Sequence, residues 1–346
     1  GRDRILSYFI NMNKRLNHHK SMIGENMFDV TALGELLIDF TSCRKDEAEM
    51  QLFEQNPGGA PGNVLTALSR CGLSTAMLGK VGRDLHGSFL KETLENNHIC
   101  TDGVIMDDSV FTTLAFVEIS KDGERKFSFA RKPGADMMLQ KEEISTDIIE
   151  NSRIFHIGSL SLTDEPVRSS TWYALDKAKR AGCVISYDPN YRSDLWKNRD
   201  LAISEMRKVL PYISLMKLSD EETELLTGIK DPMKAAEKLV KQGISVVTVT
   251  LGAQGAIVCN REGTRLVRGF ESHVVDTTGA GDSFWGGFLY CYIQSKKKPD
   301  EITLDEAAEF TCFANAMASL CVEKRGGMPS IPHRRLVEER ARDFQS

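Results

Sequence analysis

The sequence predicts one large α/β domain built on a mostly parallel sheet, with a small antiparallel attachment. From residue 28 onward, short β-branched or apolar runs alternate with helical stretches, and several helical stretches end at glycine. Residues 111–131 differ, because they read as two strands in succession. Length and composition agree, since 346 residues with 41% hydrophobic content can bury a sizeable core.

The main domain is expected to alternate strands and helices along the chain. Strands are predicted at 29–34, 75–78, 154–157, 183–187, 213–217 and 246–250. Helices are predicted at 62–71, 85–96, 166–181, 199–209, 219–227 and 232–242. This order is typical of crossover βαβ units, in which helices flank a parallel sheet.

The attachment begins with a predicted hairpin. Strands at 111–119 and 124–131 are joined by Lys121-Asp122-Gly123, a sequence that favours a tight turn. We expect this ribbon to form a small sheet with 35–42 and 50–55. Such a sheet would act as a lid over a site at the carboxyl ends of the parallel strands. The predicted lid comprises about 35–56 and 110–132.

Charge and cysteine content exclude several classes of protein. A net charge of −5 gives no general attraction to nucleic acid, and no apolar run approaches the roughly 18 to 20 residues of a membrane span. The eight cysteines lack a CxxC pair, which indicates reduced thiols in the cytoplasm. Residues 1–26 are interpreted as a disordered or non-native leader before the domain at 27–346.

The segment Asp276-Thr277-Thr278-Gly279-Ala280-Gly281-Asp282 joins a predicted strand to a helix. Free N–H groups at a helix start attract anions, and glycine lets a phosphate approach the backbone. Phosphoryl transfer needs such donors beside a group that accepts the hydroxyl proton. Gly279, Ala280 and Gly281 would supply the donors and Asp282 the acceptor. Alternatively, Asp282 is an ordinary acidic residue in a first helical turn.

A second glycine-rich turn, at 57–63, also opens a helix. Its backbone and the amide of Asn63 would suit a sugar hydroxyl, although a plain helix entry is also consistent with the pattern. Asp39 is a carboxylate on an otherwise apolar strand, either solvated or accepting hydrogen bonds from two neighbouring hydroxyls. The chain has no P-loop, and Gly279-x-Gly281 lacks the third glycine of a dinucleotide fingerprint.

Polar residues follow other predicted strands. Ser219 and Glu222 fit a capping box, and Glu222 at a strand end could equally order water around Mg²⁺. The run Thr250-Leu251-Gly252-Ala253-Gln254-Gly255 is typical of a turn beside a nucleotide or of a hairpin. Arg131 ends the lid ribbon, and Arg192 follows the strand predicted at 183–187. Surface arginines are mostly just solvated.

Together these segments resemble the ribokinase-like (PfkB) carbohydrate kinases, and most closely the fructokinases. GGAPGN at 58–63 with GKVGRDLHG at 79–87 looks like the first family signature, and DTTGAGDSFWGGFL at 276–289 looks like the second. The likeness runs from about Phe28 to Pro332. It implies a three-layer ribokinase-like fold with a small β lid.

The resemblance also implies roles for particular residues. It implies Asp282 as general base and the amides of Gly279 to Asp282 as an anion hole. Sugar contacts are implied at Asp39, Gly58, Gly59, Asn63, Arg131 and Arg192. ATP contacts are implied at Lys217, Ser219, Thr250, Gly252, Gly255 and, in a helix at 311–319, Asn315. Mg²⁺ is implied through water at Glu222, and a candidate K⁺ site at Asp276, Thr278, Cys321 and Gly326.

The expected activity is transfer of phosphate from ATP to the 6-hydroxyl of D-fructose. The nearest alternative is a kinase for 2-keto-3-deoxygluconate or another sugar, and Ala130 stands where relatives with that substrate often carry tyrosine. An alternative of another class is a non-catalytic sugar- or nucleotide-binding scaffold. The expected partners are a small sugar and ATP, without nucleic acid or membrane, and with a candidate homodimer through the lid.

Overall fold

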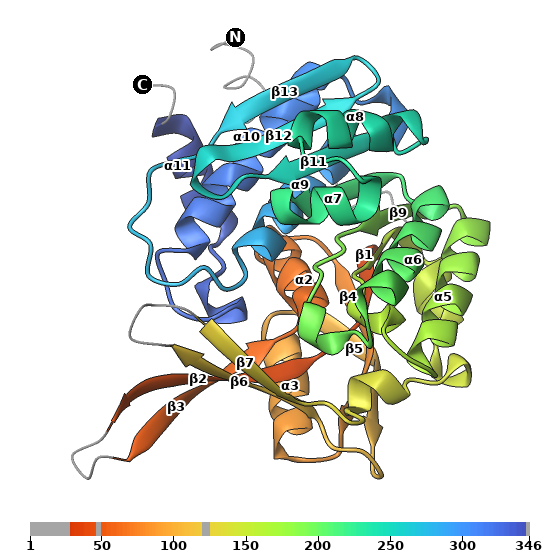
Figure 1. Ribbon diagram of the computed structural model, residues 1–346, viewed down its shortest axis with the longest axis vertical. Coiled ribbons are helices and arrows are strands. Elements are labelled where there is room, and N and C mark those ends of the chain that lie inside the picture. The colour runs from red at the N-terminus through yellow and green to blue at the C-terminus, as the bar shows by residue number, and fades with distance from the viewer. Residues whose placement is uncertain (1–27, 46–49, 120–124, 344–346) are drawn as a thin grey trace.

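The computed structural model describes residues 28–45, 50–119 and 125–343. A nine-stranded sheet forms the centre of the molecule, in the order β13-β12-β11-β10-β9-β8-β1-β4-β5 (Figure 1). The strands from β11 to β5 in that order pair in parallel, and β12 and β13 are antiparallel. The strands are β1 (Phe28–Leu33), β4 (Thr75–Gly82), β5 (Ile99–Asp107), β8 (Ser152–Ile157), β9 (Val184–Tyr187), β10 (Leu215–Ser219), β11 (Val246–Thr250), β12 (Gly255–Asn260) and β13 (Gly263–Arg268).

Helices cover both faces of this sheet, each over its own hydrophobic core. One face carries α2 (Ala60–Arg70), α3 (Leu85–Asn96), α9 (Ala280–Ser295), α10 (Leu304–Cys321) and α11 (Arg334–Asp343). The other carries α4 (Thr146–Glu150), α5 (Val167–Ala181), α6 (Arg199–Val209), α7 (Asp220–Thr227) and α8 (Pro232–Lys241). The predicted three-layer α/β fold is confirmed. None of the helices in the described ranges is long and apolar enough to cross a membrane.

The predicted strands and helices of the main domain are present, with ends that differ by one or two residues, except that β4 extends four residues beyond the predicted 75–78. β5, β12 and β13 were not predicted, nor were α4 and α11. The strand predicted at 213–217 lies at 215–219, because 210–212 form a 3₁₀ turn that continues α6. The helix implied at 311–319 is the second half of α10.

The attachment is a separate four-stranded sheet in the order β3-β2-β6-β7, which projects from the body (Figure 1). β2 (Leu37–Lys45) and β3 (Gln51–Gly58) form one antiparallel hairpin, and β6 (Thr113–Ile119) and β7 (Arg125–Ala130) form another. A parallel pairing of β2 with β6 joins the two hairpins. The predicted turn at 121–123 and the leader at 1–26 lie outside the described residues.

The two faces of this small sheet differ in chemistry, because side chains alternate along each strand. Asp39 pairs with Asn56, and both line the cavity described below. On the opposite face, Phe40 stacks on Phe116 with ring centroids 5.4 Å apart, and Phe53 packs edge-on against Phe116 at 6.1 Å. The face toward the cavity is mixed, since it also carries Leu37, Val117 and Phe129. The opposite face carries the aromatic cluster, in which Phe40 also contacts His86 of α3 with ring centroids 5.5 Å apart.

Asp84, in the predicted signature 79–87, joins the lid sheet to the main domain. Its carboxylate caps α3 by accepting hydrogen bonds from the backbone N–H groups of His86 and Gly87, at 3.0 and 2.8 Å. It also accepts from the backbone N–H and the hydroxyl of Thr112, which directly precedes β6. One carboxylate thus holds a helix start and the entry to the lid.

We expect Asp84→Ala to lower the free energy of unfolding by about 1–3 kcal/mol, because a helix cap and two further hydrogen bonds are lost together. Urea denaturation followed by circular dichroism would measure the change. Asp108→Ala is the matched control, since Asp108 is 78% exposed and pairs only with the exposed Arg83. Equal effects of the two substitutions would contradict the role assigned to Asp84.

Candidate active site

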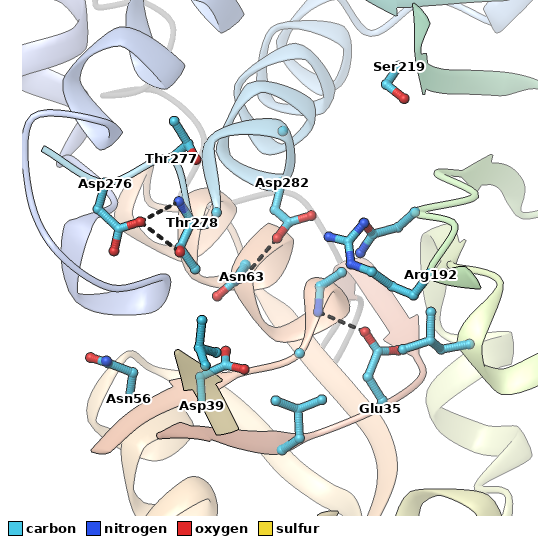
Figure 2. Close-up of a pocket in the computed structure, with 18 of the residues that line it drawn as sticks. Glu35, Asp39, Asn56, Asn63, Arg192, Ser219, Asp276, Thr277, Thr278 and Asp282 are labelled. Atoms are coloured by element: carbon cyan, nitrogen blue, oxygen red, sulfur yellow. Dashed lines mark hydrogen bonds between the residues drawn. The ribbon is translucent and has the colours of Figure 1, made fainter. Parts of the chain in front are cut away.

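A cavity of about 560 Å³ lies between one face of the lid sheet, the starts of α2 and α9, and the ends of parallel strands (Figure 2). Most residues predicted to bind sugar, nucleotide or metal line it. They are Asp39, Gly59, Asn63, Arg192, Lys217, Ser219, Glu222, Thr250, Gly252, Asp276, Thr278, Gly279, Gly281, Asp282 and Gly326. Sequence segments as far apart as β2 and α9 therefore meet at one place.

The start of α9 has the backbone geometry of an anion site. The helix begins at Ala280, and Gly279 precedes it with φ 77°, a left-handed conformation that glycine adopts readily. No side chain caps this helix start. The backbone N–H of Ala280 donates to the carbonyl oxygen of Thr277 at 3.2 Å, and the next N–H groups, of Gly281 and Asp282, precede the first possible intrahelical bonds. The helix start therefore presents donors to the cavity, as the sequence predicted.

Asp282 lies in the first turn of α9 and is 9% exposed. Asn63 Nδ2 donates a hydrogen bond of 2.8 Å to Asp282 Oδ2 (Figure 2). Burial raises the pKa of the Asp282 carboxyl to about 6, and the nearby charge of Asp188 adds to the rise. The charge of Lys217 and the hydrogen bond from Asn63 oppose it. A carboxylate poised near neutral pH suits proton transfer.

Lys217 places a positive charge beside the same turn. Its ammonium pairs with Asp188 Oδ2 at 2.8 Å, and both side chains are buried. A Cβ atom at Gly281 would come within 2.9 Å of Lys217 Nζ. The ammonium therefore lies against the backbone of the predicted anion hole, where it would add to the attraction for phosphate.

Asp276 holds the loop that leads into α9. Its Oδ1 accepts hydrogen bonds from the backbone N–H and hydroxyl of Thr278, and its Oδ2 accepts from the backbone N–H of Gly326 (Figure 2). The Sγ atom of Cys321 lies 3.7 Å from the carbonyl oxygen of Thr278. The four residues of the predicted K⁺ site thus lie together.

Glu222 serves as a structural cap. Its Oε2 accepts a 2.8 Å hydrogen bond from the backbone N–H of Ser219, which completes the predicted capping box of α7. Its Oε1 accepts a 2.7 Å bond from the backbone N–H of Tyr191, and so ties α7 to the loop after β9. Burial raises the pKa of Glu222, and the charge of Asp188 adds to this effect. The capping interpretation is confirmed, and the Mg²⁺ role stays a prediction.

Comparison with known proteins identifies the family. The sequence model of the pfkB family carbohydrate kinases matches residues 27–334. The chain belongs to the pfkB family of carbohydrate kinases. "Probable fructokinase-6, chloroplastic" of Arabidopsis thaliana is 39% identical over 315 residues, which cover 90% of this chain and 81% of that protein.

Solved structures of fructokinases have the same fold as this chain. A fructokinase from Xylella fastidiosa with bound ATP superposes with a TM-score of 0.85 at 29% identity, covering 92% of this chain and all of that one. A fructokinase from Vibrio cholerae O395 with fructose, ADP and calcium ion bound superposes with a TM-score of 0.80 at 30% identity, covering 90% of this chain and 98% of that one.

Several predicted residues of this pfkB kinase do not line the cavity. Arg131 is buried and paired with Asp136 at 2.8 Å, and it is not among the residues that line the cavity, so its sugar contact stays a prediction. Asn315 donates to the carbonyl oxygens of Val267 and Arg268, both at 3.1 Å, and so fastens α10 to β13. Gly255, Gly58, Ala280 and Cys321 are also outside the lining.

Of these, Gly58 still shapes the cavity. A Cβ atom at this position would come within 2.4 Å of Asp39 Oδ2, so only glycine leaves that carboxylate in place. Ala280 lies between two lining glycines, and Cys321 contacts the carbonyl of Thr278. Gly255 has φ 102° at the turn between β11 and β12, where a Cβ atom would collide with the backbone of β13. The hairpin interpretation of 250–255 is therefore correct, and Thr250 and Gly252 still face the cavity.

The lining also contains polar residues that were not predicted as site residues, and two of them are Glu35 and Asn56. Glu35 is a buried carboxyl in the turn between β1 and β2, and Asn56 lies opposite Asp39 in the lid sheet (Figure 2). Asn56 directly precedes the glycine-rich turn, and its pairing with Asp39 could have been inferred once a β2–β3 hairpin was assumed. Glu35 carried no sequence signal beyond its place after a buried strand.

Proposed function

We propose that the chain transfers the γ-phosphoryl group of ATP to the 6-hydroxyl of D-fructose, with Asp282 as general base. The observation that carries this proposal is the position of Asp282, buried at the start of α9, a helix without a side-chain cap, and close to the Lys217 ammonium. The fructokinase names of the relatives and solved structures support fructose as the acceptor.

The reaction needs one proton acceptor and several anion donors. The sugar hydroxyl oxygen attacks the γ-phosphorus, a new P–O bond forms, and the bond to the β,γ-bridging oxygen breaks to release ADP. Asn63 holds Asp282 Oδ2, which leaves Oδ1 to accept the hydroxyl proton. The amides of Gly279 and Gly281 and the Lys217 ammonium would stabilise the charge on the phosphoryl oxygens.

We place ATP along Ser219, Thr250 and Gly252, which line the half of the cavity nearest β10 and β11. Mg²⁺ would neutralise phosphate charge when bound. The described residues contain no group of His, Cys, Asp and Glu able to hold a metal ion alone, and both oxygens of Glu222 accept backbone hydrogen bonds. This fits an ion held mainly by phosphates and water, with Glu222 behind the water. We place a monovalent cation at Asp276, Thr278, Cys321 and Gly326.

The structure argues against an acidic sugar. The expected carboxylate-binding arginines for 2-keto-3-deoxygluconate are Arg131 and Arg192, and Arg131 is fully engaged by Asp136, Thr163 and the carbonyl of Leu160. Only Arg192 lines the cavity. The intact Asp282 and glycine loop likewise favour an enzyme over a non-catalytic binding scaffold.

An ADP-release assay tests the proposal. The substrates are fructose, 2-keto-3-deoxygluconate, ribose, tagatose 6-phosphate and adenosine, each with ATP and Mg²⁺ and with or without K⁺. We expect fructose to give the highest kcat/KM, with product phosphorylated at the 6-hydroxyl. Preference for another sugar would overturn the substrate, and absence of ATP-dependent phosphorylation of any of them would overturn the activity.

The raised pKa of Asp282 predicts an acid limb in the pH profile. A general base must be ionised, so kcat/KM for ATP at saturating sugar should fall about tenfold per pH unit below about pH 6 and level off above it. Direct measurement of ADP by chromatography avoids the pH dependence of coupling enzymes. A flat profile from pH 5 to 8, with the fold shown intact by circular dichroism, would be incompatible with Asp282 as the base.

We further propose a homodimer that pairs the aromatic faces of two lid sheets. Phe53 is 41% exposed and Phe116 is 36% exposed, which is unusual for a pair of packed aromatic rings. A second copy would bury this face. Analytical ultracentrifugation should give a dimer for the full chain and a shift toward monomer for Phe116→Glu. A monomeric wild-type chain at micromolar concentration would contradict the pairing.

We propose a cytoplasmic location. All eight cysteines are free thiols, as expected in a reducing compartment, and four of them are buried. The Arabidopsis relative is named as chloroplastic, so cell fractionation with an antibody to the full chain is the measurement that decides.

A further inference from the structure

A second cavity lies at the end of α9, far from Asp282. It has a volume of about 210 Å³, and its walls are the first residues of β8 and β9 and the chain around the end of α9. α9 has 16 residues and is therefore about 24 Å long, with Asp282 in its first turn. The second cavity thus lies at the amino ends of the parallel strands, on the opposite side of the sheet edge from the candidate active site.

The charged side chains that line this second cavity are all basic. They are Arg153, Lys296, Lys297 and Lys298. Arg153 pairs with Asp29 at 3.1 Å, and Lys297 pairs with Glu306 at 2.6 Å, but neither acid lines the cavity. Lys298 forms no salt bridge with any described residue. Because like charges gathered around one cavity repel one another, a bound anion would lower the free energy of this arrangement.

Tyr292 adds an uncharged hydrogen-bond donor to the same cavity. Its side chain is 5% exposed and belongs to the lining. Its hydroxyl forms no hydrogen bond with the described residues, and its oxygen is not fully enclosed. Burial raises the pKa of Tyr292 to about 12, the charge of Arg153 opposes this rise, and the exposed Asp300 and Glu301 add to it. The hydroxyl therefore keeps its proton at neutral pH and can donate it to an anion.

The backbone of Lys296 favours a role beyond ending the helix. Lys296 is the C-cap of α9 with φ 57°, a left-handed conformation that glycine usually fills. A cation at a helix end interacts favourably with the helix dipole, and this would account for one lysine. It does not account for the three further cations that line the same cavity.

We propose that the second cavity is an anion-binding site for a phosphate group, carried either by inorganic phosphate or by a small phosphate ester. Ammonium, guanidinium and phenolic O–H groups are the donors that phosphate oxygens accept from. The volume is below the roughly 300–1,000 Å³ of pockets that hold drug-sized ligands, so the occupant is small. The site is separate from the phosphoryl-transfer site, and the inference holds whichever sugar the chain phosphorylates.

Fluorine NMR of the full chain, with 3-fluorotyrosine in place of its seven tyrosines, observes this cavity directly. Tyr292→Phe removes one signal and so assigns Tyr292. We expect inorganic phosphate to shift that signal saturably, with a dissociation constant of about 1 mM or tighter, the affinity that two or three hydrogen bonds to charged groups would give. Fructose 6-phosphate, the product of the proposed reaction, is titrated in parallel at equal ionic strength. Tighter binding of fructose 6-phosphate identifies a phosphate ester as the ligand, and equal binding identifies the phosphate group alone.

Lys296→Gln/Lys298→Gln tests the donors, because both lysines are exposed and line the cavity. We expect the dissociation constant for inorganic phosphate to rise about tenfold or more, the effect of losing a hydrogen bond to a charged group. Lys234→Gln/Lys241→Gln is the matched control, since it removes the same charge from two exposed lysines of α8 outside both cavities. This control should bind phosphate within about twofold of wild type, a change well below one hydrogen bond.

Three results would overturn the inference. They are a Tyr292 signal that does not saturate with either phosphate compound, an equal shift with chloride at the same ionic strength, and equal phosphate affinity in the two double variants. Circular dichroism checks the fold of each variant. Should Lys296→Gln/Lys298→Gln fail to fold, Arg153→Gln replaces it with the same expected loss, and unchanged affinity in Arg153→Gln would then count against the site.

Discussion

Asp282→Asn should lower kcat by at least 10²–10⁴-fold, the order of magnitude typical of general base catalysis, while the fold and ATP binding persist. The amide cannot take up the hydroxyl proton at neutral pH, but it has the shape of the carboxylate and can still accept the hydrogen bond from Asn63 Nδ2. Because Asp282 is buried and its pKa is raised, removing its charge should not destabilise the protein. The rate of ADP release measures kcat, thermal unfolding measures the stability of the fold, and titration with ATP measures ATP binding.

Asp305→Asn is the matched control for this prediction. Asp305 is also an acidic residue in a first helical turn, at the start of α10, but it is 67% exposed and pairs only with Arg265. If Asp282 were an ordinary first-turn residue, the two substitutions would have similarly small effects on kcat. Near-normal turnover in Asp282→Asn would refute the mechanism, whatever the sugar.

Sequence patterns predicted those strands and helices whose own residues show an apolar run or period bounded by turn residues. Alternating apolar runs and helical stretches located β1, β8 and β11 because each is bounded by turn residues or glycine. β12 (Gly255–Asn260) was missed since it follows β11 after a turn that also suits a nucleotide. Its pairing with β11 depends on contacts that no local pattern records.

The site was predictable where a residue's role follows from its own segment. Asp282 stands at the start of a helix after glycines, so its position followed from the motif. Glu35 did not, because its burial and its bond to Ala60 arise only when β1 and α2, 25 residues apart in sequence, are brought together. The partners of Arg131 were equally beyond sequence reasoning, since Asp136, Thr163 and the carbonyl of Leu160 are brought to its guanidinium by the tertiary fold.

The buried pair of Arg131 and Asp136 should have the largest effect on stability. The side chains are 3% and 2% exposed, and Asp136 Oδ2 accepts from both Nε and Nη2 of Arg131, at 2.9 and 2.8 Å. Asp136→Ala leaves the guanidinium buried without a counter-charge. We expect this variant to lower the free energy of unfolding by about 3–5 kcal/mol, measured by urea denaturation, because desolvation of an unpaired charge is not compensated.

Two comparisons separate this structural role from the sugar contact predicted for Arg131. Asp176→Ala breaks the exposed pair with Arg180, which is 74% exposed, and should cost less than about 1 kcal/mol. The double variant Arg131→Met/Asp136→Leu removes both charges and should recover most of the lost stability.

The same double variant tests sugar binding. If Arg131 instead bound the sugar, Arg131→Met/Asp136→Leu would raise KM for fructose tenfold or more, the effect expected from losing one hydrogen bond to a charged group. Because the Arg131 guanidinium is engaged by Asp136, Thr163 and the carbonyl of Leu160, we expect KM in the double variant to stay within about threefold of wild type, a change of less than 1 kcal/mol.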